Sequence, residues 1–321
     1  MEKVVSYQEV LEENIKKLNL PNTPKNLYDP LRYFMTLGGK RTRPTLTLLG
    51  CQLFGKPGIK ALNAALAVEL FHNFTLIHDD IMDEAPLRRG KVTVHEKWNT
   101  NVGILSGDVL FVEAYKLLAK NDISVLPQLI EVFSKTAVEV CEGQQLDMDF
   151  ESRDDVKIEE YIEMIRLKTS VLLGAALEMG AIVAEASESD KKHLYNFGVN
   201  VGIAFQLQDD YLDLYADPEK FGKQVGGDII TNKKTFLLLK AKELADDHQA
   251  KKLEALLENE NAEKVEQAKS LFTEIGVDKL AKNLMYEYYE KAKKDMAAIQ
   301  VPEDAKQELI ALGEYLINRD I

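Results

Sequence analysis

The sequence of 321 residues is poor in cysteine and has no excess of basic residues. Its two cysteines, Cys51 and Cys141, are too few for a disulfide framework and fit a reducing cytoplasm better. Both stand in apolar helical context, so we expect buried structural thiols. The formal net charge of -13 at pH 7 argues against a nucleic-acid surface, because such a surface needs a basic stripe.

The sequence also lacks a long hydrophobic run. The longest, VLLGAALEMGAIVA at 171–184, is too short to span a bilayer and contains Glu178. The N-terminal segment lacks the basic start and the apolar stretch of a secretory signal. We therefore expect a soluble cytoplasmic protein without stable membrane insertion.

Strand-like alternation of apolar and polar residues is scarce, whereas helical spacing is frequent. Apolar residues recur three and four apart, as in Leu62, Leu66, Leu70 and Phe74. Breaks rich in Pro, Gly and Asn fall at 20–26, 55–58, 84–90, 216–228 and 274–277, and the apolar pattern resumes after each. This organisation predicts an all-α fold, with residues 1–321 forming a single domain of many packed helices.

Two acidic runs, HDDIMD at 78–83 and LQDDYLD at 207–213, each carry the pattern Asp-Asp-x-x-Asp. Residues four apart share a helix face, so Asp79 pairs with Asp83, and Asp209 with Asp213. Like charges at this spacing repel each other. A chain that carries such a carboxylate pair in two places is suited to bind hard cations there. Mg²⁺ in particular binds through one or two carboxylates plus substrate phosphates. A single motif is equally compatible with a solvated polar edge.

The first acidic run is followed directly by Arg88 and Arg89. Arginine donates paired hydrogen bonds to phosphate, so carboxylates and arginines side by side predict a metal-bridged diphosphate. The alternative is a surface ion pair between one arginine and a nearby aspartate, which would contribute little. On a helical wheel, His72 and Thr75 share the stripe of Asp79.

A second concentration of basic residues is LGGKRTRPTL at 37–46. Backbone N–H groups at a helix start, with Lys40 and Arg43 nearby, make an anion site, and Pro44 is suited to the first helical turn. The phosphate-binding string of nucleotide hydrolases is absent, so nucleotide hydrolysis has no support. An ordinary basic turn is the alternative.

Further polar residues lie near the second acidic run in the sequence. Gln206 lies on its acidic helical face, where an amide could orient a substrate or a metal-bound water. The downstream segment FGKQVGGDIITNKKT, with Lys223 and Lys233, could close over an anion, although a plain surface loop is an equally good interpretation. In RLKTS, Lys168 and Thr169 interrupt an apolar helix, and such a lysine needs a solvent route or a partner.

Taken together, these motifs resemble the trans-isoprenyl diphosphate synthases, also called polyprenyl synthetases. GGKRTRP, HDDIMD with RRG, EGQQLDMDF at 142–150, KTS, FQLQDDYLD, and FGK leading to NKKT occur in the order and approximate spacing of that family, over residues 30–240. The resemblance implies an all-helical bundle around a deep central pocket, usually as a homodimer. It also implies condensation of isopentenyl diphosphate with an allylic diphosphate, with release of diphosphate.

The resemblance further implies roles for individual positions. An isopentenyl diphosphate site would comprise Lys40, Arg43, His72 and Arg89. An allylic diphosphate site would comprise Arg88, Lys168, Thr169, Gln206, Lys223 and Lys233. Several Mg²⁺ ions would bind Asp79, Asp83 and Asp209, supported by Asp80, Asp210 and Asp213. The residues expected to carry catalysis are Asp79, Asp83, Lys168, Gln206 and Asp209.

Product length is expected to depend on the helix before the first acidic run. Phe74 precedes Asp79 by five residues, about 7.5 Å at 1.5 Å rise per residue. An aromatic residue there resembles the floor of short-chain synthases, while Thr75 points closer to Asp79. The first motif also lacks the two-residue insertion of typical bacterial farnesyl diphosphate synthases. We expect a C20 product, with C15 close behind; simple core packing of Phe74 is the alternative.

Two rival functions share parts of this pattern. A class I terpene cyclase also carries an acidic motif in an all-α fold, but it does not need GGKRTRP and a second full acidic motif. A non-catalytic subunit of a heteromeric synthase would keep the fold and lose acidic residues, whereas both motifs are intact here.

Overall fold

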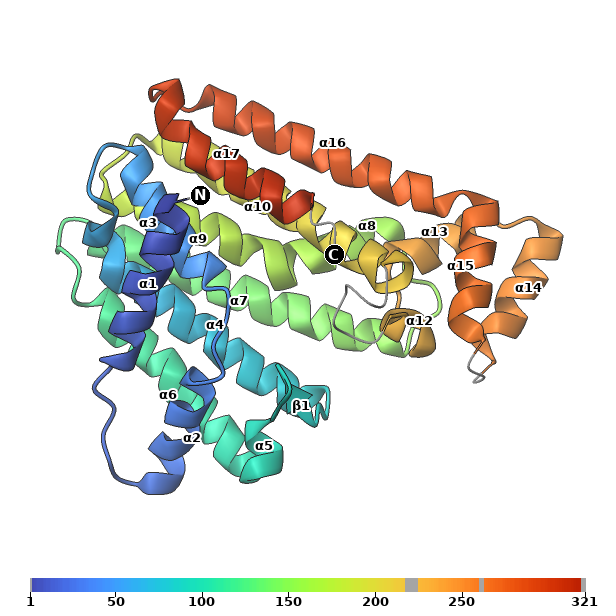
Figure 1. Ribbon diagram of the computed structural model, residues 1–321, viewed down its shortest axis with the longest axis horizontal. Helices are drawn as coiled ribbons and strands as arrows, with labels where there is room; N and C mark the ends of the chain where they lie inside the picture. Colours follow the sequence, from blue (N-terminus) through green and yellow to red (C-terminus); the bar gives the residue numbers. More distant parts are fainter. Residues whose placement is uncertain (1, 217–224, 260–262, 319–321) are drawn as a thin grey trace. The chain divides into compact units, whose positions relative to one another are not determined.

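The computed structural model describes residues 2–216, 225–259 and 263–318, and their regular structure is almost entirely helical (Figure 1). The all-α prediction is therefore confirmed. The helices are α1 (Glu2–Lys16), α2 (Lys25–Met35), α3 (Thr42–Leu53), η1 (Gly58–Ala61), α4 (Leu62–Met82), α5 (Val94–Lys97), α6 (Thr100–Leu118), α7 (Leu126–Glu151), α8 (Ile158–Ile165), η2 (Arg166–Ser170), α9 (Val171–Val183), α10 (Glu188–Tyr215), α12 (Gly227–Ile230), α13 (Phe236–Leu244), α14 (Asp247–Leu257), α15 (Lys264–Ile275), α16 (Val277–Ala298) and α17 (Glu303–Ile317). Across these described ranges, no helix is long and apolar enough to cross a membrane.

The chain divides into two compact units. Unit 1 comprises Met1–Ala137, Ala175–Tyr195 and Ile299–Leu309. Unit 2 comprises Val138–Gly174, Asn196–Ala298 and Ile310–Ile321. The prediction of a single domain stays a prediction.

Unit 1 is built on α4, which packs along α6 and against α3 (Figure 1). Every residue from Ala64 to Phe71 is buried, as expected for a helix that is apolar on nearly all sides. The sequence pattern predicts a helix over 59–85; the α-helix runs from Leu62 to Met82, preceded by the 3₁₀ turn η1. Asp83 therefore caps the helix instead of lying within it.

A short hairpin follows α4, which the sequence pattern did not predict. Its strands are β1 (Leu87–Arg88) and β2 (Lys91–Val92), paired antiparallel with Leu87 opposite Val92. Thr93 Oγ1 donates to the Ala85 carbonyl oxygen at 2.7 Å, which ties the two ends of the hairpin together.

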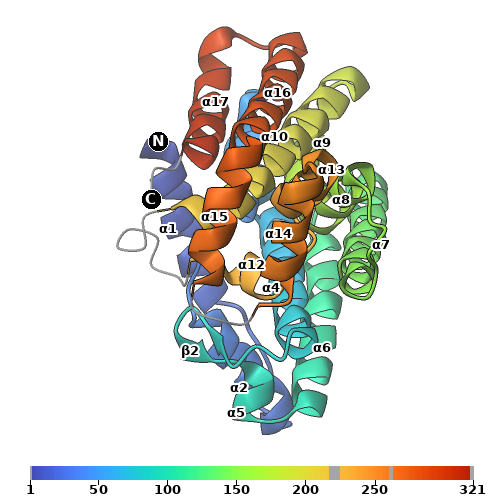
Figure 2. The same ribbon diagram turned by 90° about the vertical axis from the view of Figure 1, so that its right-hand side faces the viewer.

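Most of the charged segment of residues 240–300 belongs to unit 2, and its described helices are the end of α13 and the whole of α14, α15 and α16. The side-by-side pair α14 and α15 is seen in Figures 1 and 2. Leu253, Leu256 and Leu271 are buried, as expected for amphipathic helices with an outer charged face. Asp246 caps α14 by accepting hydrogen bonds from the N–H groups of His248 and Gln249.

The two cysteines differ in burial. Cys51 is buried on α3, as expected, but Cys141 is exposed on α7, so the prediction of a buried thiol is wrong there. On the same helix the adjacent Glu142 is exposed, and so are Val138 and Gln145, which lie three and four residues away. Apolar sequence context does not decide which face of a helix is covered.

Candidate active site

The first acidic motif ends α4 in unit 1, and its three aspartates have different surroundings. Asp79 is half-buried, Asp80 is buried and Asp83 is exposed. Arg88 places both Nε and Nη2 at 2.8 Å from Asp80 Oδ1. Burial raises the pKa of the Asp80 carboxyl, while Arg88 opposes that shift. An ion pair in this loop, the alternative considered above, is thus present, but its carboxylate lies in the interior and not on the surface.

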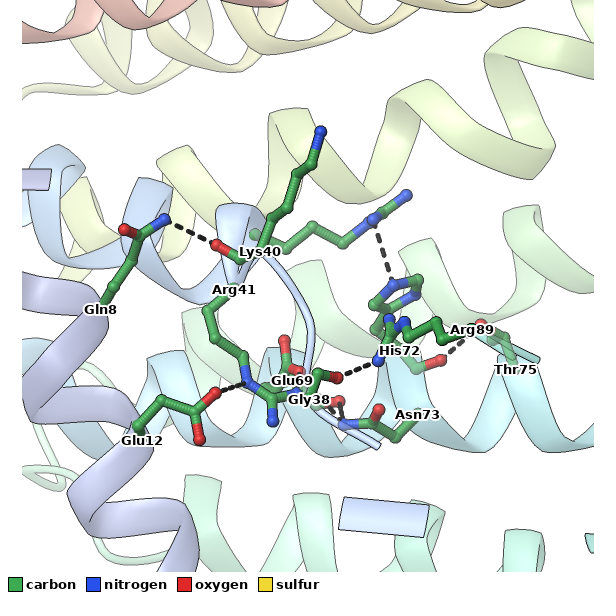
Figure 3. A network of polar contacts seen from close by, with 11 residues as sticks. Gln8, Glu12, Gly38, Lys40, Arg41, Glu69, His72, Asn73, Thr75 and Arg89 are labelled. Atoms are coloured by element: carbon green, nitrogen blue, oxygen red, sulfur yellow. Dashed lines mark hydrogen bonds and ion pairs between the residues drawn. The ribbon is translucent and has the colours of Figure 1, made fainter. Parts of the chain in front are cut away.

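Arg89 and the loop before α3 form the second feature of unit 1. Arg89 stands in the left-handed region (φ 53°) at the tip of the hairpin, and its Nη1 donates to the Gly38 carbonyl oxygen (Figure 3). Gly39 has a φ of 150°, and a Cβ there would lie 3.0 Å from Arg89 Nη1. The φ of Gly39 is one that residues with a side chain rarely adopt, which favours glycine at this position.

His72 and Arg43 are joined directly, since Arg43 Nη1 lies 3.2 Å from His72 Nε2. A guanidinium can only donate, so Nε2 accepts and a neutral imidazole carries its proton on Nδ1. Burial, and then the positive charges of Arg43 and Arg89, hold the pKa of His72 well below its usual value. The ring is therefore neutral at physiological pH.

Unit 1 thus brings together Arg43, His72 and Arg89, three of the four side chains expected at an isopentenyl diphosphate site. Arg43 contacts His72, and the positive charge of Arg89 lowers the pKa of the same imidazole ring. Arg89 also binds the carbonyl oxygen of Gly38, and the exposed Lys40 lies two residues further along that loop. Arg43 Nε is buried and has no hydrogen-bond partner among the residues that the structure describes. A buried donor without a partner costs about 1–3 kcal/mol, and an anionic oxygen is the group that would satisfy it.

Phe74 and Thr75 occupy different surroundings on α4. The Phe74 ring stacks on Phe111 of α6, with centroids 5.0 Å apart and an interplanar angle of 11°. It also contacts Phe71 at 5.6 Å and His78 at 4.6 Å between centroids. Thr75 Oγ1 donates to the His72 carbonyl oxygen at 2.8 Å. Phe74 is part of an aromatic cluster, and its role in product length stays a prediction.

The second acidic motif lies on α10 in unit 2. Asp210 accepts hydrogen bonds from Gln206 Nε2 at 3.0 Å and from the Tyr161 hydroxyl. Burial raises the pKa of Asp210 to about 7, and the nearby charge of Asp228 acts in the same direction. The Gln206 amide, expected to orient a ligand, is thus held by the middle aspartate of the motif.

The third aspartate of this motif is held by the short helix α12. The backbone N–H of Asp228 donates to Asp213 Oδ2 at 3.0 Å. Lys233 Nζ lies 4.0 Å from Asp228 Oδ1. Burial raises the pKa of Asp228 to about 6, Lys233 opposes this, and the charges of Asp213 and Asp209 add to it. Lys223 lies outside the described residues.

Lys168 and Thr169 occupy the π-helical segment η2 between α8 and α9. Such wide turns often mark functional sites, because they turn side chains that a regular helix would direct elsewhere. Lys168 Nζ donates to Asp147 Oδ2 at 2.5 Å, and Thr169 Oγ1 donates to Gln206 Oε1 at 3.4 Å. Unit 2 therefore brings Lys168, Thr169 and Gln206 together with the second acidic motif.

The polyprenyl synthetase family model matches residues 24–275. The chain belongs to the polyprenyl synthetase family. Its relatives and structural neighbours are prenyl diphosphate synthases, and it is a transferase of that type.

Three similar proteins illustrate the relation of this polyprenyl synthetase to its family. The geranylgeranyl pyrophosphate synthase of Geoglobus acetivorans is 39% identical over 317 residues, which are 97% of this chain and 96% of the relative. The crystal structure of a geranylgeranyl pyrophosphate synthase superposes with a TM-score of 0.94 at 46% identity, covering 99% of both chains. A polyprenyl synthase from Caulobacter crescentus CB15, complexed with calcium and isoprenyl diphosphate, has a TM-score of 0.86 at 29% identity, covering 100% and 98%.

The acidic motifs of this polyprenyl synthetase have the donor chemistry of a hard cation, namely carboxylate oxygen. In the part of the chain that the structure describes, no cluster of three or more His, Cys, Asp or Glu side chains is arranged to hold a metal ion. Mg²⁺ binds through one or two carboxylates, keeps several waters and takes substrate phosphates, so it does not need a protein cage. The residues therefore fit Mg²⁺ bound together with a diphosphate.

Sequence reasoning missed three partners that this polyprenyl synthetase places at the expected site residues. Asp147 binds Lys168, Tyr161 binds Asp210, and Asp228 binds Asp213. A signal existed for Asp147, because a lysine within an apolar helix needs a partner and EGQQLDMDF carries acids. The pairings of Tyr161 and Asp228 depend on packing between distant segments, which no local pattern reports.

Proposed function

We propose that this protein is a Mg²⁺-dependent synthase that condenses isopentenyl diphosphate with an allylic diphosphate to a short-chain all-trans prenyl diphosphate. The observation that carries the proposal is the basic cluster of Arg43, His72 and Arg89 in unit 1, with a buried Arg43 donor that an anionic oxygen would satisfy. The proposed product has a C20 chain, and a C15 product is the second candidate. The geranylgeranyl names of the similar proteins support C20.

Each unit contains residues proposed to bind a substrate diphosphate and Mg²⁺. In unit 1, Lys40, Arg43, His72 and Arg89 bind isopentenyl diphosphate, and Asp79 and Asp83 hold Mg²⁺ with Asp80 in support. In unit 2, Lys168, Thr169, Gln206, Lys223 and Lys233 bind the allylic diphosphate, and Asp209 holds Mg²⁺ with Asp210 and Asp213 in support. Arg88 is also proposed to bind the allylic diphosphate.

The chemistry of these residues suits ionisation of an allylic diphosphate. Mg²⁺, when bound, neutralises negative charge that builds on the departing diphosphate. Fixed guanidinium and ammonium groups such as Arg88 and Lys168 stabilise the same charge without reorganising. The isopentenyl double bond then forms the new C–C bond to the allylic carbon, and a proton is lost to the released diphosphate.

Two ion pairs and the neutral state of His72 bear on how these side chains are positioned. Asp147 holds the Lys168 ammonium, and Asp80 holds the Arg88 guanidinium, so both cations are positioned before a diphosphate arrives. Neutral His72 adds no cationic charge, so its contribution to the isopentenyl site is a directed hydrogen bond. Preorganised donors of this kind lose little freedom on binding.

We further propose that the protein is a cytoplasmic homodimer. Helix α6 exposes the large apolar side chains of Ile104, Leu105 and Val112 on unit 1. Exposed apolar side chains gathered along one helix mark an interaction surface.

The test is an incubation of the purified protein with labelled isopentenyl diphosphate and dimethylallyl, geranyl or farnesyl diphosphate. Mg²⁺ is supplied in one series and removed with a chelator in the other, and dephosphorylated products are separated by chromatography. We expect Mg²⁺-dependent elongation that stops at C20. No elongation of any primer would refute the proposal, and a cyclised hydrocarbon would identify a terpene cyclase instead.

The Asp79→Ala variant tests the metal site in the same assay. Loss of the carboxylate removes a proposed Mg²⁺ ligand, so we expect turnover to fall to background while the circular dichroism spectrum is unchanged. Glu96→Ala, which removes an exposed carboxylate of α5, is the control and should keep wild-type activity. Near-normal turnover of Asp79→Ala would show that this residue does not hold the metal.

A further inference from the structure

Arg41 stands between the two proposed anion ligands Lys40 and Arg43, yet it is oriented inward. Its side chain is only 2% exposed, and its backbone is left-handed (φ 48°, ψ 32°) directly before α3. A left-handed conformation costs a non-glycine residue about 1–2 kcal/mol. Tertiary contacts must therefore hold it there.

Those contacts come from two helices (Figure 3). Arg41 Nε donates to Glu12 Oε1 of α1 at 2.7 Å, and its Nη1 donates to Glu69 Oε1 of α4 at 2.5 Å. Asn73 Nδ2 lies 3.2 Å from the same Glu69 oxygen. The planar fork of arginine reaches both carboxylates at once, which the single ammonium of a lysine does not.

The charged groups of this network shift one another's pKa values. Burial raises the pKa of the Glu69 carboxyl, while the positive charge of Arg41 opposes the shift. Burial alone would lower the pKa of Arg41, but Glu69 and Glu12 outweigh it and leave the pKa above its usual value. A buried ion pair of this kind is costly to break, because the remaining charge has no partner. Nε and Nη1 of Arg41 are therefore bound to carboxylates of the protein, while its buried Nη2 has no hydrogen-bond partner among the described residues.

Helix α1 holds the same loop at a second point. Gln8 Nε2 donates to the Lys40 carbonyl oxygen at 2.7 Å, so α1 binds the backbone of Lys40 and the side chain of Arg41. Figure 3 shows the Lys40 side chain pointing away from the Arg41–Glu69 pair. One end of the loop is thus fixed inside the unit, while the ammonium of Lys40 is left at the surface.

Two parallel links join the start of α3 to α4. Arg41 binds Glu69, and Arg43 binds His72, which lies three residues further along α4. Residues three apart on a helix lie on one face, so both links reach the same side of α4. A shift of Arg41 would therefore move the Arg43–His72 contact as well.

We infer that Arg41 is a positioning residue for the isopentenyl diphosphate subsite. Together with Glu12 and Glu69, it fixes the left-handed turn that sets Lys40 and Arg43 around the anion, and it does not touch the anion itself. This inference rests on the function proposed above.

The test is steady-state kinetics of Arg41→Lys and Glu12→Gln, with each substrate varied in turn. Arg41→Lys keeps the charge but loses one of the two carboxylate contacts, and Glu12→Gln removes the partner on α1. We expect the KM for isopentenyl diphosphate to rise about tenfold in both variants, because small displacements of binding groups weaken a site strongly. The KM for the allylic substrate should be unchanged, and kcat at saturation should be retained.

Glu13→Gln is the matched control, since Glu13 neighbours Glu12 on α1 but is 65% exposed and paired with Lys17. Its KM values should equal those of the wild type. If Arg41→Lys and Glu12→Gln lower kcat and leave the KM for isopentenyl diphosphate unchanged, Arg41 is a structural residue only and the inference fails. If the wild type elongates no primer, the proposed function fails first and the inference falls with it.

Discussion

At the residue scale, Phe74 combines a position expected to limit product length with a side chain held by other rings. Its ring stacks on Phe111, which in turn contacts Phe71 and Tyr115. We expect Phe74→Ala to shift the product from C20 to longer chains, because removing the ring opens space beside α4. The measurement is product chromatography with farnesyl diphosphate as primer.

The control for Phe74→Ala is Phe133→Leu, which alters the same aromatic cluster from α7 through its contacts with Phe71 and Tyr115. Its product should keep the wild-type length. An unchanged product from Phe74→Ala would leave Phe74 as ordinary core packing, the alternative that the sequence also allows.

Glu178 gives a prediction about pH, since it is the one carboxylate within the apolar run of residues 171–184. Burial raises its pKa from 4.5 to about 7, and Lys135 and Lys191 oppose the shift. The folded state thus prefers the protonated form. This contribution to stability is fully present below the unfolded value and is lost as pH rises through the folded value.

The matching variant is Glu178→Gln, which keeps the shape of the protonated side chain and cannot ionise. As pH rises from 5 to 8, the free energy of unfolding of the wild type should fall relative to that of Glu178→Gln. The relative change should be at most about 3 kcal/mol. Urea unfolding at both pH values measures this difference. Glu142→Gln, on an exposed position of α7, should show no such change. A difference between Glu178→Gln and wild type that is equal at both pH values would contradict the assignment.

At the scale of elements, α3 and α9 approach each other within unit 1 through glycine. A Cβ on Gly180 would lie 2.1 Å from the Thr47 carbonyl oxygen, and one on Gly50 would lie 2.5 Å from the Leu177 carbonyl oxygen. Both obstacles are backbone atoms, which a rotamer change cannot move. We expect Gly180→Ala to lower the free energy of unfolding by about 1–3 kcal/mol, the usual cost of overpacking.

Denaturant unfolding of Gly180→Ala checks this, with Gly313→Ala of α17 as the control. A Cβ on Gly313 would meet Phe197 Cζ at 3.5 Å, which is ordinary contact. In a helix, Ala is favoured over Gly by up to about 1 kcal/mol, so this control should be neutral or stabilising. If Gly180→Ala and the wild type had equal free energies of unfolding, α3 and α9 would accommodate the added methyl group without loss of stability, and the prediction would be wrong.

At the scale of the whole molecule, the apolar side chains exposed on α6 predict self-association. Leu105 and Val112 are each 58% exposed on the same helix. We expect the wild type to sediment as a dimer and the double variant Leu105→Lys with Val112→Lys to sediment as a monomer, because buried ammonium groups would oppose the interface. Ile123→Lys alters a residue that is 78% exposed beyond α6 and should remain dimeric. A monomeric wild type, or a dimeric double variant, would remove the α6 face as the interface.

Much of this molecule could be predicted from local patterns. The three- and four-residue spacing of apolar side chains indicates helices, since helical periodicity is a property of neighbouring residues. The end of α4 near the first acidic motif follows from the same pattern together with Pro86. The order of GGKRTRP, the two acidic runs and KTS was sufficient to suggest the family, and the match over residues 24–275 confirms it.

Other features depended on packing between distant segments, so sequence reasoning did not find them. The hairpin after α4 is too short to show alternation, and the π-helical segment that carries Lys168 has the composition of an ordinary helix. Exposure of Cys141 depends on which face of α7 is covered, and not on the residues beside it.

The basic motif separates the two kinds of information most clearly. The sequence by itself determined that three cations, Lys40, Arg41 and Arg43, stand at the start of a helix, because the order of residues and the local helix signals are contained in the chain. Only the tertiary structure decided that Arg41 is directed inward to Glu12 and Glu69 while Lys40 is exposed. The reason is that the partners of a charge come from other helices, and their distances are set by how those helices pack.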